Sequence, residues 1–442
     1  MAAERAVGVG LIGFGTIGTG VVRVLQRNAD VIAQRLGFPL RLVRIADIDT
    51  ARDRGVDLAG TPFDADSADL LADPEVEIAI ELVGGYDTAR DLILEAIGAG
   101  KHVVTANKAL LALHGKAIFE AARKAGVDVA FEAAVGGGIP ILRSLREGLA
   151  ANRITHLHGI MNGTTNYVLT QMEQSAEPFE VVLKRAQELG YAEADPSTDV
   201  DGVDAAHKLT LLASMAFGAE LTYKQIPTEG IRDVSPVDIE AAEEFGYRIK
   251  LLGIAKAHGE GPERIEARVH PTLIPANSLL AHVDGAMNAV AVTGNAVGPT
   301  LFYGAGAGEL PTASAVVADL MEIAREIRRE TAGRVAPLSY VPDALEPKPL
   351  VPLGELEGRF YLRFTAVDRP GVLAHVTAVL GEHRIGIESV LQKGRAAGPG
   401  SVPVLVLTHL APEEGVRRAL EEIDRLPDVT SPTRLIRIEE DM

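Results

Sequence analysis

Residues 191–208 read YAEADPSTDVDGVDAAHK and are followed by the apolar run LTLLASMAFG. Asp204 and Lys208 are four residues apart, which places them one turn apart on the same face of a helix. Such a pair suits the reduction of a carbonyl group, because a cation or acid must stabilise the alkoxide that hydride addition creates. The spacing equally allows an ordinary surface salt bridge, which contributes roughly a few tenths of a kcal/mol.

Four more carboxylates precede this pair. Glu193 would suit the ammonium group of an amino-acid substrate, although taken alone it is equally a solvated loop acid. Asp195 belongs to an Asp-Pro turn, and we expect it, with Asp199 and Asp201, to cap the following helix. We do not expect these three aspartates to be catalytic.

A glycine-rich turn, GFGTIG, follows the apolar residues 6–12 and precedes a segment with helical periodicity. Gly13, Gly15 and Gly18 meet the pattern G-x-G-x-x-G in the strand–turn–helix context that it requires. In that pattern the first glycine allows a tight turn, the second lets a pyrophosphate approach the backbone, and the third lets helix and strand pack closely. The turn therefore predicts a dinucleotide site.

The next strand, LRLVRIADID, ends in acids and is flanked by arginines. Asp47 at its end would bond the ribose hydroxyls and favour NAD. Arg44, Arg52 and Arg54 lie close by, and any of them would suit the 2′-phosphate of NADP. Each arginine is equally an ordinary polar residue of a loop, so the sequence leaves the choice between NAD and NADP open.

The elements that must position these residues indicate an α/β chain of several domains. Strands and helices alternate over residues 1–135, which predicts a Rossmann-type doubly wound sheet closed by a helix at 311–330. Residues 136–310 indicate an α+β catalytic and dimerisation domain. Residues 335–357 contain five prolines and predict a linker. Residues 358–442 have the order βαββαβ of a ferredoxin-like module.

Bulk composition excludes several classes of protein. The 442-residue chain has no cysteine, which rules out disulfides and thiolate chemistry. Its formal net charge of −18 disfavours nucleic acid and anionic membranes as partners. No segment approaches the ~20 apolar residues of a membrane span, and no signal peptide is apparent, so we expect a cytoplasmic protein.

The residue types in the turn AVGGGIP indicate a site for a cation. Its glycines free backbone carbonyls to converge, and Glu132 supplies one formal charge, which fits a weakly bound hard cation with oxygen ligands. A hinge between two domains is the alternative, and the two roles are compatible.

In its motifs the chain resembles homoserine dehydrogenase, in the monofunctional class that has a C-terminal ACT regulatory domain. The resemblance covers essentially the whole chain in order, and the stretch 190–208 is its most specific part. The motifs that carry it are GFGTIG (13–18), ANKAL (106–110), FEAAVGGGIPI (131–141), MNGTTNY (161–167), GYAEADPSTDVDGVDAAHK (190–208), GAGAGELPTASAV (304–316) and DRPGVLAHV (368–376).

The resemblance implies an enzyme of amino-acid biosynthesis that reduces L-aspartate 4-semialdehyde to L-homoserine with NAD or NADP as cofactor. It implies that Lys208 shuttles the proton, that Asp204 is its partner, and that Glu193 holds the amino end of the substrate. It also makes Lys108 a second active-site lysine near the nicotinamide, and which lysine delivers the proton stays open. The resemblance further implies that these residues contact the cofactor: Gly13, Phe14, Gly15, Thr16, Ile17, Gly18, Asp47, Lys108 and Gly306.

The same resemblance implies a monovalent cation, typically sodium, at Glu132, Val135, Gly137 and Ile139. It also implies inhibition by L-threonine through the ACT module and a homo-oligomer, dimer or tetramer. An ACT module kept only for assembly is one alternative. Another Rossmann dehydrogenase would lack the set formed by Glu193, Asp204 and Lys208. A non-enzymatic amino-acid sensor would have had Asp204 or Lys208 replaced.

Overall fold

The computed structural model describes residues 5–259, 263–392 and 400–442. The chain forms two compact units, and each is made of three stretches of sequence. The first unit contains Met1–Thr155, Ala206–Gln225 and Asn288–Lys348, and the second contains His156–Ala205, Ile226–Met287 and Pro349–Met442. The domain boundaries given above stay a prediction. In the described part of the chain, no helix has the length and apolar content that crossing a membrane requires.

The first unit is built on a six-stranded sheet in which every pairing is parallel. Its order, β3-β2-β1-β4-β5-β6, reverses direction at β1, which creates the switch point where doubly wound sheets bind ligands. This confirms the predicted fold class. The strands are β1 (Val7–Ile12), β2 (Leu40–Ala46), β3 (Phe63–Asp64), β4 (Ile78–Glu81), β5 (His102–Thr105) and β6 (Val129–Ala130).

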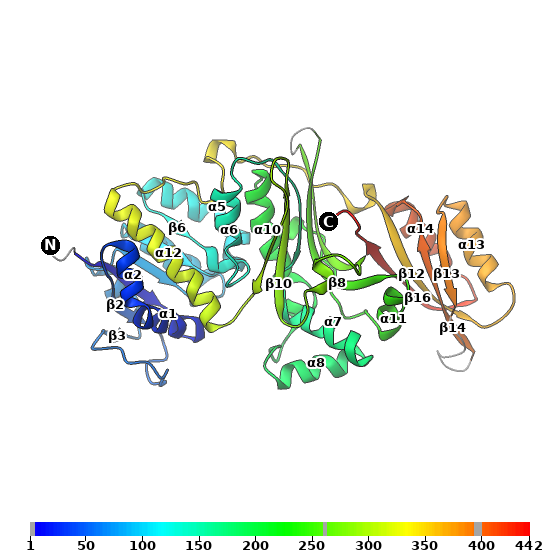
Figure 1. Ribbon diagram of the computed structural model, residues 1–442, viewed down its shortest axis with the longest axis horizontal. Coiled ribbons are helices and arrows are strands. Elements are labelled where there is room, and N and C mark those ends of the chain that lie inside the picture. Colours follow the sequence, from blue (N-terminus) through cyan, green and yellow to red (C-terminus); the bar gives the residue numbers. More distant parts are fainter. Residues whose placement is uncertain (1–4, 260–262, 393–399) are drawn as a thin grey trace. The chain divides into compact units, whose positions relative to one another are not determined.

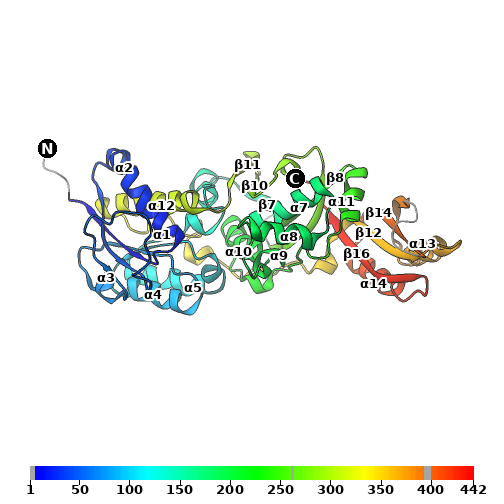
Figure 2. The same cartoon turned by 90° about the horizontal axis from the view of Figure 1, so that it is seen from below.

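Helices cover both faces of this sheet (Figure 2). One face carries α1 (Thr16–Arg27), α2 (Ala29–Leu36) and α12 (Glu309–Arg329), and the other carries α3 (Ala68–Ala72), α4 (Asp87–Gly98) and α5 (Lys108–Ala125). α12 comes late in the sequence yet packs along α1 (Figure 1). Gly20 permits this approach, because a Cβ there would lie 2.8 Å from Glu309 Cγ and 3.1 Å from Ala313 Cβ.

The boundaries of two helices in this unit have local causes. α5 begins at Lys108, because the Asn107 side chain caps it by accepting the Leu110 N–H at 3.1 Å. The short α6 (Ile141–Arg143) is followed by a π-helix at Ser144–Gly148. Leu149 N–H accordingly bonds the Ser144 carbonyl, five residues back, at 2.7 Å. The 3₁₀ turn η1 (Glu132–Ala134) and the strands β10 (Met287–Gly294) and β11 (Gly298–Ala305) complete the elements near the glycine-rich turns.

The second unit contains a mixed sheet in which neighbouring strands follow the order β7-β8-β9-β16-β12-β14-β13. Its pairings are antiparallel except between β16 and β9, where Arg437 pairs with Thr272 and Ile438 with Leu273 in parallel register. The strands are β7 (Ile154–Ile160), β8 (Tyr247–His258), β9 (Arg264–Pro275), β12 (Glu357–Val367), β13 (Ile387–Gln392), β14 (Ser401–Thr408) and β16 (Val429–Ile438).

The C-terminal part of the second unit has the predicted βαββαβ order. It runs β12, α13 (Val372–Glu382), β13, β14, α14 (Glu413–Ile423) and β16, with the short β15 (Ala411–Pro412) added beside β12. Its core is apolar and includes Phe360, Leu380 and Val416. Because β16 pairs with both β12 and β9, the sheet of this module continues into the sheet of β7, β8 and β9.

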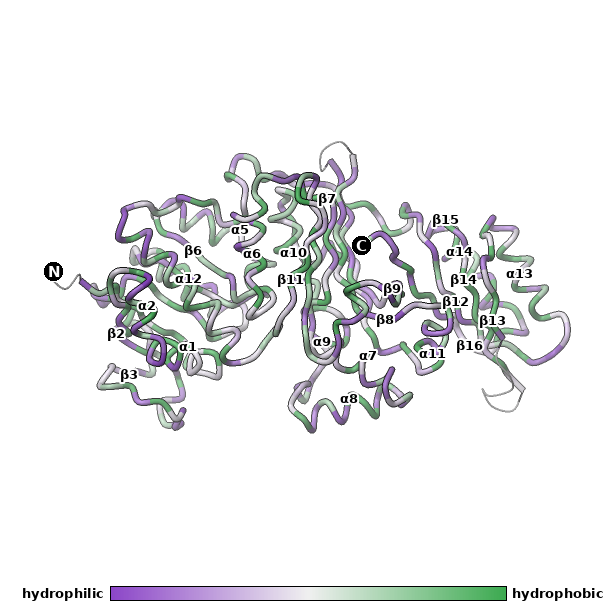
Figure 3. The backbone as a smooth tube through the Cα atoms, viewed as in Figure 1, coloured by the Kyte–Doolittle hydropathy of each residue, from purple (hydrophilic) through white to green (hydrophobic). Residues whose placement is uncertain are grey.

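The remaining helices of the second unit are α7 (Gly163–Ser175), α8 (Phe179–Glu188), α9 (Ser197–Val200) and α11 (Pro236–Glu244), and α10 (Val203–Phe217) follows α9. Hydrophobic and hydrophilic residues alternate along α8 (Figure 3). Its buried residues Phe179, Val182 and Ala186 recur at helical spacing and form its inner face. α8 therefore anchors the loop that carries Glu193, which follows it directly.

The buried carboxyl group of Glu326, on α12, leads us to predict how the stability of the folded protein depends on pH. Burial, with the neighbouring Asp128 and Glu322, raises the pKa of Glu326 to about 7. The folded state thus keeps a proton that the unfolded state releases near pH 4.5, so stability falls as pH rises from about 4.5 to about 7. Over this pH range the loss in the free energy of unfolding is at most on the order of 3 kcal/mol.

We expect Glu326→Gln to remove this loss, since glutamine stays neutral. The melting temperature of the variant, relative to wild type, should rise between pH 5 and pH 8 and then level off. Thermal unfolding followed by circular dichroism across this range measures the difference. Parallel melting curves at every pH would show that Glu326 is ionised throughout in the folded protein.

Candidate active site

The three glycines of GFGTIG have different surroundings. Gly13 has a φ of +94°, and a Cβ there would lie 2.5 Å from the Leu82 carbonyl carbon. A Cβ on Gly18 would lie 2.3 Å from the Gly13 carbonyl oxygen. Gly15 has no heavy atom within 4 Å of that position. Gly13 and Gly18 are therefore required by packing, whereas Gly15 leaves open space beside the first turn of α1.

The N-terminus of α1 suits an anion. Gly15 is the N-cap and offers no side-chain cap, so the first N–H groups of the helix are not satisfied by a capping side chain. Backbone N–H groups and the helix dipole together favour a phosphate at such a terminus. The residues present thus fit the pyrophosphate of a dinucleotide.

Asp47 lies directly after β2 and closes the same turn. Its carboxylate accepts the Phe14 N–H at 2.5 Å and the Asp49 N–H at 2.8 Å. Arg54 lies 3.5 Å from this carboxylate, donates to the Phe14 carbonyl at 2.6 Å, and places its guanidinium 4.8 Å from the Phe14 ring centre. Asp47 and Arg54 therefore fix the shape of the glycine turn as well as bordering the predicted ribose position.

The other two arginines considered for the 2′-phosphate differ from each other. Arg44 donates to Asp64 and Asp73, each at 3.0 Å, and these two carboxylates occupy its guanidinium. Arg52 is exposed, and its backbone N–H bonds Asp49. Of the three arginines, Arg52 and Arg54 therefore remain as candidates for binding a 2′-phosphate near Asp47.

Sequence reasoning missed a carboxylate at the end of β4. Glu81 is buried and accepts the Thr105 hydroxyl at 2.6 Å and the N–H groups of Val83 and Gly84 at 2.9 and 3.2 Å. Through these bonds it shapes the glycine turn after β4 and ties it to the end of β5. Its signal in the sequence was an acid at the end of the buried strand IAIE, three residues before the first glycine of the pair Gly84–Gly85.

Lys108 is the first residue of α5, just after β5. The preceding Asn107 caps α5 and also donates its amide to the Gly85 carbonyl at 2.8 Å. The loops after β4 and β5 are therefore joined at the edge of the sheet where parallel α/β sheets bind ligands. Lys108 lies at this edge, as its predicted role near the nicotinamide requires.

The predicted cation residues surround a tight turn in the first unit. Glu132 is buried, and its carboxylate accepts the N–H groups of Leu142 and Arg143 at 2.9 and 2.8 Å. Burial raises the pKa of Glu132, and these two N–H groups oppose the shift. The carboxylate thus caps the helix that follows, a role that the sequence did not indicate.

Gly137 and Gly306, which the sequence assigned to the cation and to the cofactor, lie against each other. A Cβ on Gly137 would lie 2.6 Å from the Gly306 carbonyl oxygen, and Gly138 N–H bonds the Ala305 carbonyl at 3.0 Å. Gly137 has a φ of +53°, in the left-handed region, and this backbone conformation sets the direction of its carbonyl group. Carbonyl oxygens beside one carboxylate are ligands of the kind that a hard cation takes.

In the second unit, Asn162 joins two of the carboxylates that precede Lys208. Its amide donates to Asp199 at 2.6 Å and to Asp204 at 2.9 Å. Its oxygen accepts the Thr165 N–H at 2.8 Å and caps α7. The bond to Asp204 was not foreseen. Asn162 and Asp204 are both buried, at 4% and 6% exposure, so this amide fixes the carboxylate.

α10 carries both Asp204 and Lys208, one helical turn apart. Lys208 is 7% exposed and is followed by the buried residues Leu209, Leu211 and Leu212. A buried ammonium is stable only with compensating charge or hydrogen bonds. The pair is thus no surface salt bridge, which was the alternative that spacing alone allowed.

Glu193 lies in the loop after α8 and is exposed. Its backbone carbonyl accepts the Gln187 amide at 3.0 Å, while its carboxylate has no hydrogen bond to another described residue. The loop is held by Tyr191, whose ring stacks on Tyr167 at 4.3 Å and whose carbonyl accepts the Thr164 hydroxyl at 2.8 Å. Asp195 accepts the N–H and the hydroxyl of Ser197 at 3.1 and 2.6 Å, although the N-cap residue of α9 is Pro196. Asp199 lies within α9 and Asp201 is its C-cap, and the capping of the helix that carries Lys208 by these three aspartates stays a prediction.

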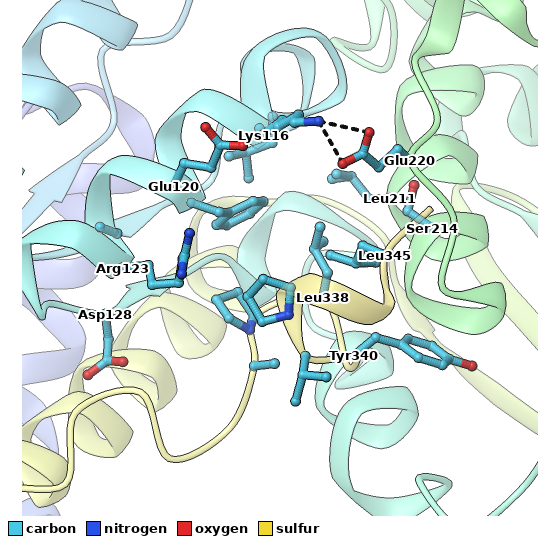
Figure 4. Close-up of a pocket in the computed structure, with 18 of the residues that line it drawn as sticks. Lys116, Glu120, Arg123, Asp128, Leu211, Ser214, Glu220, Leu338, Tyr340 and Leu345 are labelled. Atoms are coloured by element: carbon cyan, nitrogen blue, oxygen red, sulfur yellow. Dashed lines mark hydrogen bonds and ion pairs between the residues drawn. The ribbon is translucent and has the colours of Figure 1, made fainter. Parts of the chain in front are cut away.

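A cavity of about 600 Å³ in the first unit does not belong to this site (Figure 4). It lies among α5, the second half of α10 and residues 332–345, and none of the predicted site residues lines it. Its lining is mainly apolar, including Phe119, Leu211 and Leu338, and a Lys116–Glu220 ion pair of 2.9 Å lies at its edge.

Fold and glycine turn together define a nicotinamide-dinucleotide oxidoreductase with an added ferredoxin-like module. Residues 140–321 match the family described as homoserine dehydrogenase, residues 13–132 its NAD-binding domain, and residues 360–428 the ACT domain. The chain therefore belongs to the homoserine dehydrogenase family, and it is an NAD(P)-dependent oxidoreductase with a C-terminal ACT domain.

Two relatives match this chain over nearly its full length, and a third matches part of it. A homoserine dehydrogenase from Pseudomonas aeruginosa is 49% identical over 99% of both chains. The crystal structure of a homoserine dehydrogenase from Thiobacillus denitrificans superposes with a TM-score of 0.92 at 48% identity, again over 99% of both chains. A hyperthermophilic archaeal homoserine dehydrogenase in complex with NADPH shares the fold, with a TM-score of 0.60 at 24% identity over 72% of this chain and 98% of that one.

Proposed function

We propose that this chain reduces L-aspartate 4-semialdehyde reversibly to L-homoserine and that Asp204 and Lys208 carry the proton chemistry. The observation that supports these roles most directly is the buried pair on α10, whose carboxylate is fixed by the Asn162 amide. A carboxylate one helical turn away provides a compensating charge for a buried lysine. We expect the reaction to take place in the cytoplasm.

The bound nicotinamide supplies the hydride. Lys208 donates a proton to the oxygen of the aldehyde as that oxygen becomes an alkoxide, so aldehyde, hydride and proton together give the alcohol. In the reverse direction the neutral amine of Lys208 accepts the hydroxyl proton. Asp204 stabilises the charged form of the lysine. Glu193, whose carboxylate is exposed, binds the ammonium group of the amino-acid substrate.

We infer that both NADH and NADPH are accepted. Asp47 offers a carboxylate to the ribose hydroxyls of NAD, while Arg52 and Arg54 offer positive charge to the 2′-phosphate of NADP. Arg44 contributes to the binding of neither cofactor, because its guanidinium is paired with Asp64 and Asp73. Gly306, which packs against Gly137, and Lys108 complete the proposed cofactor contacts.

A monovalent cation, sodium, is proposed at the turn of Glu132, Val135, Gly137 and Ile139. The oxygen donors of this turn fit a hard cation. Because the Glu132 carboxylate already caps α6, the backbone carbonyls would provide most of the ligands. The ion would then stabilise the turn that brings Gly137 against Gly306.

We also propose that L-threonine binds the ACT domain and inhibits the enzyme, and that the chain forms a dimer or tetramer. The sequence DRPGVLAHV begins α13 at a left-handed Gly371, with a φ of +96°. Buried Asp428 holds this turn by pairing with Arg369 and by bonding His375 at 3.0 Å. An inhibitor must favour one of two arrangements of the protein, which an oligomer of such modules provides.

The test follows the absorbance of NADH and NADPH with L-aspartate semialdehyde. We expect rapid oxidation of both cofactors, slower turnover when choline replaces sodium, and inhibition by added L-threonine. Pyruvate, a carbonyl compound without an ammonium group, is the control substrate and should not react. No turnover with either reduced cofactor would overturn the proposed reaction and favour an amino-acid sensor.

A further inference from the structure

Residues Ile226–Arg232 form a segment, here called the bridging segment, that lies against β9 in the second unit. Glu229 N–H donates to the Val269 carbonyl at 2.8 Å, and Val269 N–H donates to the Pro227 carbonyl at 2.9 Å. These two bonds seat the segment beside the strand that also pairs with β16 of the ACT domain. The bridging segment thus has the ACT domain as an immediate neighbour.

Where the bridging segment faces the ACT domain, the Glu229 carboxylate is bound by two arginines of that domain. Arg437 on β16 donates to its two oxygens at 2.9 and 3.1 Å, and Arg417 on α14 donates at 3.2 Å. Both arginines also bond Glu413, at 2.7 to 2.8 Å. Arg437 and Glu413 are 3% and 1% exposed, so these charges depend on one another for compensation.

On its other side, the bridging segment touches the residues that lead to Asp204. A Cβ on Gly230 would lie 2.2 Å from the Val200 carbonyl oxygen, and Ile231 N–H donates to this same oxygen at 2.9 Å. Arg232 donates to the Asp201 carboxylate at 2.5 and 3.1 Å. The contact is too close for the two stretches to move independently.

Val200 and Asp201 come directly before α10, and Asp204 lies in the first turn of that helix. Asp204 and Asp199, on either side of them in sequence, both accept from the Asn162 amide. A displacement of the bridging segment would therefore change the position of the Asp204 carboxylate relative to this amide. A continuous set of contacts connects β16 to Asp204.

We propose that Glu229 is a positioning residue, through which Arg437 and Arg417 of the ACT domain hold the Asp199–Asp204 stretch in its active arrangement. This inference rests on the proposed function, because it assigns the regulation of the same catalytic carboxylate. It makes the ACT domain part of the support of the active site even when no effector is bound.

The test compares Glu229→Gln with Glu243→Gln, an exposed glutamate of α11 that serves as the matched control for loss of one charge. We expect Glu229→Gln to lower kcat about tenfold and to speed amide hydrogen exchange in peptides covering residues 197–204 about tenfold. The KM for NADPH should stay within about twofold of wild type, since the glycine turn is untouched. Glu243→Gln should change none of these.

Two further variants separate this role from general damage. Arg417→Gln removes the outer, half-exposed contact to Glu229 together with the Arg417–Glu413 ion pair, leaves the Arg437–Glu229 pair in place, and should give a smaller change of the same kind. The effect of Glu229→Gln combined with Arg437→Gln should be smaller than the sum of the two single effects, because both substitutions remove the same Glu229–Arg437 ion pair.

Exchange and kcat equal to those of the Glu243→Gln control would overturn the proposal, as would additive effects in the double variant. Should Glu229→Gln fail to fold, Arg417→Gln decides by the same two readouts. If the wild type lacks the proposed activity, that function fails by itself, and the exchange of residues 197–204 still decides whether Glu229 positions them.

Discussion

Replacement of Lys208 by methionine is expected to lower kcat by roughly 10³-fold, while the affinity for NADPH stays unchanged. Methionine matches the apolar stem of lysine and can fill the same buried position, so the fold should persist. What is lost is the proton donor for the alkoxide. Steady-state oxidation of NADPH gives kcat, and quenching of protein fluorescence gives cofactor affinity.

Lys224→Met is the matched control, because Lys224 is an exposed lysine of the same unit. It should keep wild-type kcat. Lys108→Met distinguishes the two candidate donors: a loss confined to cofactor affinity would leave Lys208 as the proton donor. Full kcat in Lys208→Met with a large loss in Lys108→Met would transfer the role to Lys108.

The second large effect concerns the glycine turn. Gly15→Val is expected to weaken NADPH binding roughly 100-fold with little change in melting temperature. A Cβ at Gly15 meets no heavy atom within 4 Å, so the folded protein tolerates the side chain. The added methyl groups would then occupy the space through which a pyrophosphate approaches the backbone.

Gly18→Val is expected to do the reverse and to lower stability by about 3 kcal/mol or more, because its Cβ would overlap the Gly13 carbonyl. Isothermal titration with NADPH and thermal unfolding of both variants measure the contrast. Equal losses of stability in the two variants would mean that Gly15 is also required for packing and has no special role toward the cofactor.

Local patterns in the sequence predicted much of the fold. The strand–turn–helix order around GFGTIG, the return of α12 and the βαββαβ module each follow from periodicity and turn residues over short stretches. The resemblance to a family supplied the candidate residues, and the structure shows that Asp204 and Lys208 are buried. Their roles in the reaction stay predictions.

What the sequence could not predict depends on residues far apart in the chain. The Asn162 amide meets Asp204 across 42 positions, and Arg437 meets Glu229 across 208. No local pattern encodes such pairs, since packing of whole elements brings them together. The bond between Glu81 and Thr105, which are 24 positions apart, was missed for the same reason.

The parallel pairing of β16 with β9 has a consequence for how the ACT domain can be separated from the enzyme. If the chain were cut before β12, the backbone N–H and C=O groups of β9 at Thr272 and Leu273 would lose the strand that now covers them. An uncovered strand edge pairs readily with other chains and promotes aggregation. In this protein the ACT domain therefore also covers the edge of the sheet formed by β7, β8 and β9, and its removal would promote aggregation.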